Sequence, residues 1–111
     1  MSKYKARKTA VDGITFDSQA EARRYQLLKH WRDTGIIMDL ELQPAYELAP
    51  GVLVPGTKRK RPAVKYVADF RYRVAATGRE VIEDVKGVET PMFKLKRHLL
   101  ALRGVAVEIV R

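Results

Sequence analysis

The sequence has no cysteine among its 111 residues. This absence excludes disulfides, thiolate zinc sites and cysteine nucleophiles. The sequence also lacks any apolar run that approaches the length of a membrane span. The segment 1–5 carries positive charge, but no apolar stretch follows it, so it is not typical of a signal peptide. A cytosolic protein without a membrane partner is therefore the default expectation.

Negative charge is also scarce, with 13 aspartates and glutamates against 22 lysines and arginines and a net charge of +9. Such an excess favours a polyanionic partner, because lysine and arginine neutralise phosphates and release counterions. Charge alone does not separate DNA from RNA, or an enzyme from a binder. With 111 residues, the chain is long enough to fold as one domain, 1–111, around its own core. Its 46% of hydrophobic residues predicts a globular domain rather than disorder.

The predicted elements follow the order α-β-β-β-α-β. They are a helix at 18–33, strands at 36–48, 64–74 and 80–88, a second helix at 90–103 and a last strand at 105–110. Ser18 and Glu21 have the spacing of a capping box at the start of the first helix. The second and third strands form an alternating hairpin. Because a helix connects the last two strands, we expect them to be parallel in a mixed sheet.

Two basic segments lie outside this framework. Residues 1–12 are polar and basic, and we expect a mobile arm. Residues 49–62 contain two glycines and three prolines around the run Lys58-Arg59-Lys60-Arg61, which predicts a long basic loop. The run either contacts DNA or is a solvated charge run, and the overall charge of the chain favours contact.

The second predicted helix combines apolar and basic side chains. Met92, Leu95, Leu99 and Leu102 recur at helical spacing and form its predicted apolar stripe. Lys96 lies beside this stripe. It either reaches the site or a phosphate, or it is a solvated lysine.

The most informative pattern is a pair of aspartates in neighbouring strands, because aspartate is depleted inside strands. If Arg73 opposes Glu80 in the hairpin, Asp69 opposes Asp84 on the same face. Lys86 follows Asp84 by two residues and projects from the same side. The simpler alternative is a solvated strand face on which nearby basic side chains neutralise both aspartates. In this register Glu83 points to the other face and is interpreted as structural. Gln43 either points toward the site or, as the simpler interpretation, is a polar strand residue.

Glu21 falls within the apolar face of the first helix, where a carboxylate faces the sheet and needs a partner. The capping box explains a glutamate at this position without any chemistry. With Asp69 and Asp84, however, Glu21 would complete a set of three carboxylates that suits Mg²⁺ or Mn²⁺. Such a metal activates water and stabilises charge during displacement at a phosphate. Lys86 is then a candidate to orient that water or stabilise charge, with an ordinary surface lysine as the alternative.

These residues and their neighbours resemble the PD-(D/E)xK nuclease superfamily, and more closely a family of small phage-type nucleases related to archaeal Holliday-junction resolvases. The similar stretches cover nearly the whole chain in the right order: residues 11–18, 21–22, 25, 42–44, 66–70, 84–87, 90 and 93–96. Two positions depart from the pattern. Alanine rather than proline precedes Asp69, and Asp84 stands where many superfamily members carry glutamate.

The resemblance implies a restriction-endonuclease-like core and a Mg²⁺- or Mn²⁺-dependent DNA endonuclease. It assigns Glu21, Asp69 and Asp84 as metal ligands, the carbonyl of Val85 as a further ligand and Lys86 as the catalytic lysine. Branched DNA is the expected substrate, and other DNA structures cut by nicking or recombination nucleases are the alternative. A non-catalytic nucleic-acid-binding protein with the same fold is the alternative from another class. A homodimer is left open, as is location in a host cytoplasm if a phage encodes the chain.

Overall fold

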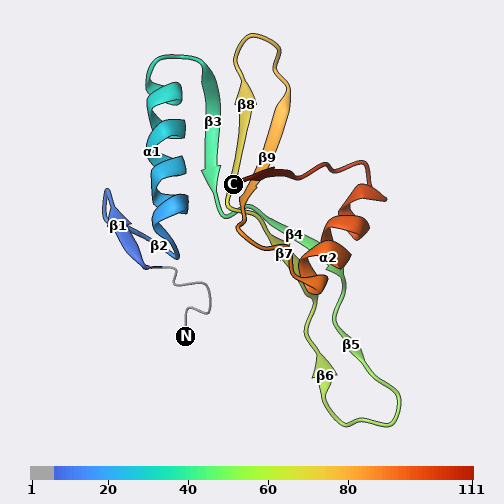
Figure 1. Cartoon of the computed structure of the whole chain (residues 1–111). Helices are drawn as coiled ribbons and strands as arrows, with labels where there is room; N and C mark the ends of the chain where they lie inside the picture. The colour runs from blue at the N-terminus through green and yellow to red at the C-terminus, as the bar shows by residue number, and fades with distance from the viewer. Residues whose placement is uncertain (1–6) are drawn as a thin grey trace.

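The computed structural model describes residues 7–111. Its elements are β1 (Thr9–Val11), β2 (Ile14–Phe16), α1 (Gln19–Asp33), β3 (Ile37–Leu42), β4 (Ala45–Ala49), β5 (Val52–Leu53), β6 (Lys60–Arg61), β7 (Val64–Val67), β8 (Phe70–Val74), β9 (Glu80–Val85), α2 (Pro91–Ala101) and β10 (Glu108–Val110). Figure 1 shows α1 and α2 on either side of the long strands, with a narrow hairpin projecting from one end. No helix among the described residues is long and apolar enough to cross a membrane.

Four strands form the central sheet, in the order β10-β9-β8-β3. β8 is antiparallel to both β3 and β9, whereas β10 is parallel to β9. The fold is therefore mixed α/β, with the antiparallel hairpin and the parallel last strand that the sequence predicted. Arg73 pairs with Glu80 in this hairpin, which is the register that the argument for the two aspartates requires.

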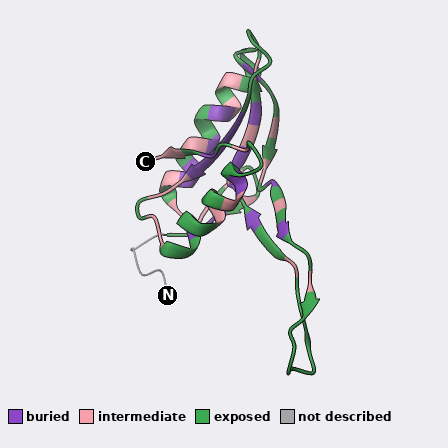
Figure 2. Ribbon diagram, turned by 90° about the vertical axis from the view of Figure 1, so that its right-hand side faces the viewer, coloured by how far each residue is buried: buried purple, intermediate pink, exposed green. Residues whose placement is uncertain are grey.

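β9 separates two hydrophobic cores, because its consecutive side chains point to opposite faces of the sheet. Val81 packs in the core that α1 covers, with Tyr25, Leu28 and Phe70. Ile82 packs in the second core, to which α2 contributes Phe93 and Leu100. Figure 2 shows the buried positions along the strands and the inner faces of the helices.

The first helix begins and ends where the sequence predicts. Ser18 is the N-cap, and its hydroxyl accepts a hydrogen bond from the Glu21 N–H at 3.0 Å. Thr34 is the C-cap, and Gly35 follows with φ of +81°, a left-handed conformation that glycine adopts readily after a helix. The N-terminal end of α1 is thereby fixed with Glu21 in its first turn.

The predicted continuous strand at 64–74 is wrong, because the chain changes sheets at Ala68 and Asp69. β7 pairs with β4 in a separate two-stranded sheet, whereas β8 pairs with β3 and β9. The Ala68 N–H donates to the carbonyl of Pro44, and the Asp69 N–H donates to the carbonyl of Glu83, each at 3.0 Å. Val67 consequently pairs with Ala45 in β4.

The basic segment at 49–62 is a hairpin arm, in which two short strands, β5 and β6, flank a loop at 54–59. β5 and β6 pair through Val52 with Arg61 and Leu53 with Lys60, and they continue the ribbon that β4 and β7 begin (Figure 1). A Cβ at Gly51 would lie 2.8 Å from the carbonyl oxygen of Arg61, so glycine allows the two strands to approach. The irregular backbone that the Pro and Gly content predicted is present at 54–59, while β5 and β6 extend the pairing of β4 with β7.

The predicted mobile arm at 1–12 is also wrong for the part that the structure describes. Thr9–Val11 is β1, which pairs with β2, while residues 1–6 lie outside the described residues. Asp12 and Gly13 join the two strands with φ of 55° and 75°, as a two-residue turn of type I′ requires. The Tyr25 hydroxyl donates to Asp12 at 3.0 Å, which ties the turn to α1.

The predicted apolar stripe of the second helix is not its buried face. Phe93 and Leu100 are buried, whereas Met92, Leu95 and Leu102 are exposed. Phe93 and Leu100 lie seven residues apart, two helical turns, and so share one face. The helix therefore packs mainly through Phe93 and Leu100, and of the predicted stripe only Leu99 packs, partly buried, against this core.

Candidate active site

Four carboxylates line one cavity of about 370 Å³: those of Glu21, Asp69 and Asp84, and that of Asp17, which precedes the N-cap of α1. Glu21 comes from the first turn of α1, Asp69 from the point where the chain changes sheets, and Asp84 from β9. Val85 and Lys86, at the end of β9, line the same cavity. The structure thus brings together the five residues that the resemblance assigns to catalysis or metal binding.

Asp69 is held by backbone on both sides. Its N–H donates to the carbonyl of Glu83, and its Oδ2 accepts the N–H of Val85 at 2.7 Å. The adjacent pair of the hairpin, Phe70 with Glu83, places Asp69 next to Asp84 in the same register. Although Asp69 lies outside β8, these bonds keep its carboxylate beside the end of β9.

Asp84 is buried and has two partners in the protein. The hydroxyl of Tyr66 donates to its Oδ2, and the Nζ of Lys86 lies 3.5 Å from its Oδ1. The Lys86 ammonium also lies 4.7 Å from the ring centroid of Phe93, a distance typical of a cation–π contact. Lys86 and Asp84 therefore share a side of β9, as their two-residue spacing predicts.

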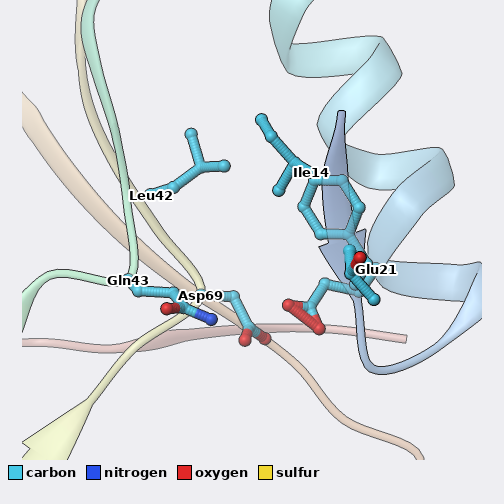
Figure 3. A pocket seen from close by; sticks show the side chains of 7 residues that line it. Ile14, Glu21, Leu42, Gln43 and Asp69 are labelled. Atoms are coloured by element: carbon cyan, nitrogen blue, oxygen red, sulfur yellow. The ribbon is translucent and has the colours of Figure 1, made fainter. Parts of the chain in front are cut away.

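Glu21 faces Asp69 across a smaller pocket that also contains Gln43 (Figure 3). Glu21 is 7% exposed, although it sits in the first turn of a helix. The Ser18 hydroxyl accepts the Glu21 N–H, as in a capping box. The Glu21 carboxylate, however, points toward Asp69. The capping role and the site role are thus compatible in one residue.

Two further residues belong to this site: Tyr66, to which the sequence assigned no role, and Gln43, for which a position toward the site was the less simple of two interpretations. Tyr66 carries the hydroxyl that orients Asp84, and its only sequence signal is a tyrosine on the face that it shares with apolar residues. Gln43 lines the pocket of Glu21 and Asp69 and adopts φ of +53°, which is unfavourable for a residue with a Cβ. Its N–H donates to the Asp69 carbonyl at 2.9 Å, and this bond holds the strained conformation.

Burial and neighbouring negative charge raise the pKa of two acids of the site, Asp69 and Glu21. Burial raises the pKa of Asp69 to about 8, with repulsion from Asp84 and Glu21 acting in the same direction and the Val85 N–H opposing it. Burial also raises the pKa of Glu21, to which the nearby charges of Asp17 and Asp84 contribute. Three carboxylates this close are difficult to ionise together without a cation.

The donor set is made of oxygens, which hard divalent ions such as Mg²⁺ and Mn²⁺ prefer. Within residues 7–111, however, no group of three or more histidine, aspartate or glutamate side chains is arranged to hold a metal ion. The residues therefore fit a metal through their chemistry and their excess negative charge, not through a preformed coordination geometry.

The other predicted residues lie apart from this cavity. Lys58-Arg59-Lys60-Arg61 is exposed on the β5–β6 arm. Lys96 is on α2 and lines a neighbouring groove that includes Lys86. Glu83 points to the opposite face of β9, where Arg24 contacts it with two hydrogen bonds of 2.8 and 2.6 Å.

The raised pKa of Asp69 predicts that the protein loses stability as pH rises when no metal is present. The folded state keeps a proton up to about pH 8, whereas the unfolded chain loses it near 3.8. Stability from this proton is complete below the unfolded pKa and is lost as pH rises through the folded pKa. We expect the free energy of unfolding in EDTA to fall by about 1–3 kcal/mol between pH 5.5 and 8.5.

Denaturant titrations of the wild type and Asp69→Asn would measure this effect. The asparagine has no proton to lose, so its profile should be flatter, and Asp69→Asn should exceed the wild type in stability at pH 8.5. Mg²⁺ should stabilise the wild type at that pH and the variant much less. Identical pH profiles for the two proteins would show that Asp69 is ionised in an ordinary solvated setting.

In a comparison with known protein families, one family model matches almost the whole chain. A family model described as "Protein of unknown function (DUF1064)" matches residues 1–110. The matched region includes every side chain of the cavity described above. No curated protein and no solved structure matches the chain.

Proposed function

The chain belongs to the DUF1064 family, whose description assigns no activity, and from the site itself we propose that it is a metal-dependent DNA endonuclease. In this proposal, Mg²⁺ or Mn²⁺ is the cofactor and the core is restriction-endonuclease-like. The sequence of elements in and beside the sheet, α1-β3-β8-β9-α2-β10, supports such a core. Branched DNA is the proposed substrate, as for the resolvases that the sequence resembles, and other DNA structures are the alternative within the same activity.

The observation that carries the proposal is the convergence of Glu21, Asp69 and Asp84 on one cavity in a chain with a net charge of +9. A protein that only binds nucleic acid gains nothing from acids at this point, because they repel phosphate. The same acids become useful once a cation joins them to a phosphate. The raised pKa values of Asp69 and Glu21 support this assignment, since burial and neighbouring carboxylates make ionisation of these acids costly without a cation.

In the proposed mechanism Glu21, Asp69, Asp84 and the carbonyl of Val85 would hold the metal. When bound, the metal supplies an activated water and stabilises negative charge on the phosphate. The Lys86 ammonium stabilises the charge that develops during displacement, because it is held at the edge of the cavity by Asp84 and Phe93.

Tyr66 has a supporting part in the same mechanism. Its hydroxyl donates a hydrogen bond to one oxygen of Asp84, which fixes the carboxylate's orientation and leaves the second lone pair of that oxygen free. The pKa of Tyr66 is raised, chiefly by burial and then by Asp84, so the phenol stays a donor at neutral pH.

The direct test is cleavage of matched linear, nicked and four-way DNA with Mg²⁺, Mn²⁺ or EDTA. We expect cleavage with either metal and none in EDTA, with the four-way DNA cut fastest. Equal rates on all three substrates would reject the preference for branches but keep the nuclease. Binding of all three DNAs without any cleavage, in either metal, would instead favour the non-catalytic nucleic-acid-binding protein.

The hairpin arm predicts a separate effect on DNA affinity. Its run Lys58-Arg59-Lys60-Arg61 has no interleaved amide or aromatic side chain to contact base edges, so we expect contacts with phosphates. Replacing all four residues with serine should weaken binding to a similar extent for different DNA sequences. The slope of log affinity against log salt should become shallower by about 2–4.

A matched control changes the arm without changing its charge. Val52→Ser and Leu53→Ser alter the partners of Arg61 and Lys60 in the same hairpin, and the double variant should keep the wild-type salt slope. Saturating DNA should restore much of the cleavage rate of the four-serine variant, since none of the four replaced residues lines the carboxylate cavity. An unchanged slope in that variant would show that the arm carries only a solvated charge run.

A further inference from the structure

A second groove of about 310 Å³ lies beside the carboxylate cavity, where β7 faces the start of α2. It is lined by Lys65, Tyr66, Val67, Lys86, Thr90, Met92, Phe93 and Lys96. Three of these side chains are lysines and none is acidic. Lys86 and Thr90 also line the carboxylate cavity, so the basic groove and the acidic cavity share a wall.

Two of the three lysines are available to an outside anion. Lys86 is balanced by Asp84 at 3.5 Å. Among residues 7–111, Lys65 and Lys96 form no ion pair. Lysine ammonium groups act as point charges toward phosphate, so this groove can attract an anion even when the acids beside it repel one.

Thr90 adds a hydrogen-bond donor to the same groove. Its Oγ1 accepts the N–H of Phe93 at 3.1 Å as the N-cap of α2. A threonine hydroxyl has one proton of its own to donate, and no residue between 7 and 111 accepts it, so it can be donated to an anion in the groove. Val67 and Met92 are half-exposed along the groove, where they offer apolar surface to the sugar that follows a phosphate.

We propose that this groove binds a backbone phosphate of the DNA strand, next to the phosphate that reacts over the carboxylates. The inference rests on the proposed function for its ligand, DNA, and adds the path that the strand takes. The strand crosses Lys86 from the acidic cavity, enters the groove beside α2 and continues toward the β5–β6 arm, into which β7 and β4 lead (Figure 1). The two basic regions thus lie on one side of the reacting phosphate.

The test measures DNA binding in EDTA, so that neither metal nor cleavage contributes. Fluorescently labelled four-way DNA is titrated with protein at several salt concentrations, and the affinity is measured at each. Lys96→Ala and Lys65→Ala are each expected to weaken binding by about 3- to 10-fold and to make the salt slope shallower by about one. Their matched control is Lys94→Ala, which removes the same charge from the exposed side of α2 outside the groove and should stay within about twofold of the wild type.

Lys96→Arg is the second variant, because it keeps the charge and should restore most of the affinity if the fold is intact. The proposal is overturned if Lys96→Ala and Lys65→Ala behave like Lys94→Ala, or if the wild type fails to bind DNA in EDTA. The nuclease proposal is tested separately. If Lys96→Ala and Lys65→Ala weaken binding but the wild type cuts no DNA, the proposed groove stands and the proposed nuclease activity is wrong. If the wild type cuts DNA but all three alanine variants bind alike, the nuclease proposal stands and the proposed groove is wrong.

Discussion

Asp69→Asn is expected to reduce the rate of DNA cleavage by about a thousandfold or more, equivalent to about 4 kcal/mol in the barrier, while DNA affinity in EDTA stays within about threefold of the wild type. The change removes the charge of a proposed metal ligand and keeps the side chain's volume. The asparagine oxygen can still accept the N–H of Val85, now 2.7 Å from Asp69 Oδ2. The basic groove and the arm are untouched, so binding should survive.

Single-turnover cleavage and binding in EDTA separate these two effects. Asp84→Asn should behave in the same way, since the Tyr66 hydroxyl can still donate to the asparagine oxygen. The matched control is Asp39→Asn, which makes the same chemical change at an exposed carboxylate outside the cavity and should cleave normally. Wild-type cleavage by Asp69→Asn would refute the metal site, and joint loss of folding and binding would assign Asp69 a structural role.

The position of the two aspartates could be argued from sequence because hairpin register follows local alternation. Arg73 opposite Glu80 fixes the pairing, and the structure has that pair. The change of sheet at Ala68 could not be argued in the same way. Tyr66 and Phe70 alternate without interruption, yet they enter different cores. The chain changes sheets because β7 pairs with β4, which follows Pro44. Pairing between such distant segments leaves no signal in the sequence of the strand itself.

The buried face of α2 was mispredicted for a related reason. Helical periodicity identifies which side chains share a face, but it does not say which face meets the protein. Four aliphatic residues made the larger stripe, whereas Phe93 and Leu100 make most of the contact and only Leu99 of the stripe joins them. A helix this short gains enough burial from two large side chains, and Lys96 is thereby turned toward the groove.

A buried ion pair between α1 and β9 was likewise beyond local patterns. Glu83 is buried, and Arg24 contacts it through both nitrogens of a fork at 2.8 and 2.6 Å. The Tyr72 hydroxyl donates to the same carboxylate, and the Arg24 guanidinium lies 5.3 Å from the ring centroid of Trp31. This network connects α1 to the strand that carries Asp84, one residue beyond Glu83.

Arg24→Met is therefore expected to lower the free energy of unfolding by about 3–5 kcal/mol, because it leaves a buried carboxylate without its cation. Equilibrium denaturation in urea at pH 7 would measure the loss. The control is the triple variant Arg24→Met, Glu83→Leu and Tyr72→Phe, which replaces the whole network with apolar groups. Such replacements are often neutral or stabilising, so the triple variant should recover most of the lost stability.

The comparison of the two proteins decides what the network does. If the single variant is as stable as the wild type, the Arg24–Glu83 pair behaves as a solvent-screened surface pair despite its burial. If the triple variant is as unstable as the single one, the loss comes from packing of the Arg24 stem rather than from the unpaired charge. Because Glu83 and Asp84 face opposite sides of β9, cleavage per folded molecule should persist in the triple variant. This result would separate the element that holds α1 on the sheet from the residues proposed to act on DNA.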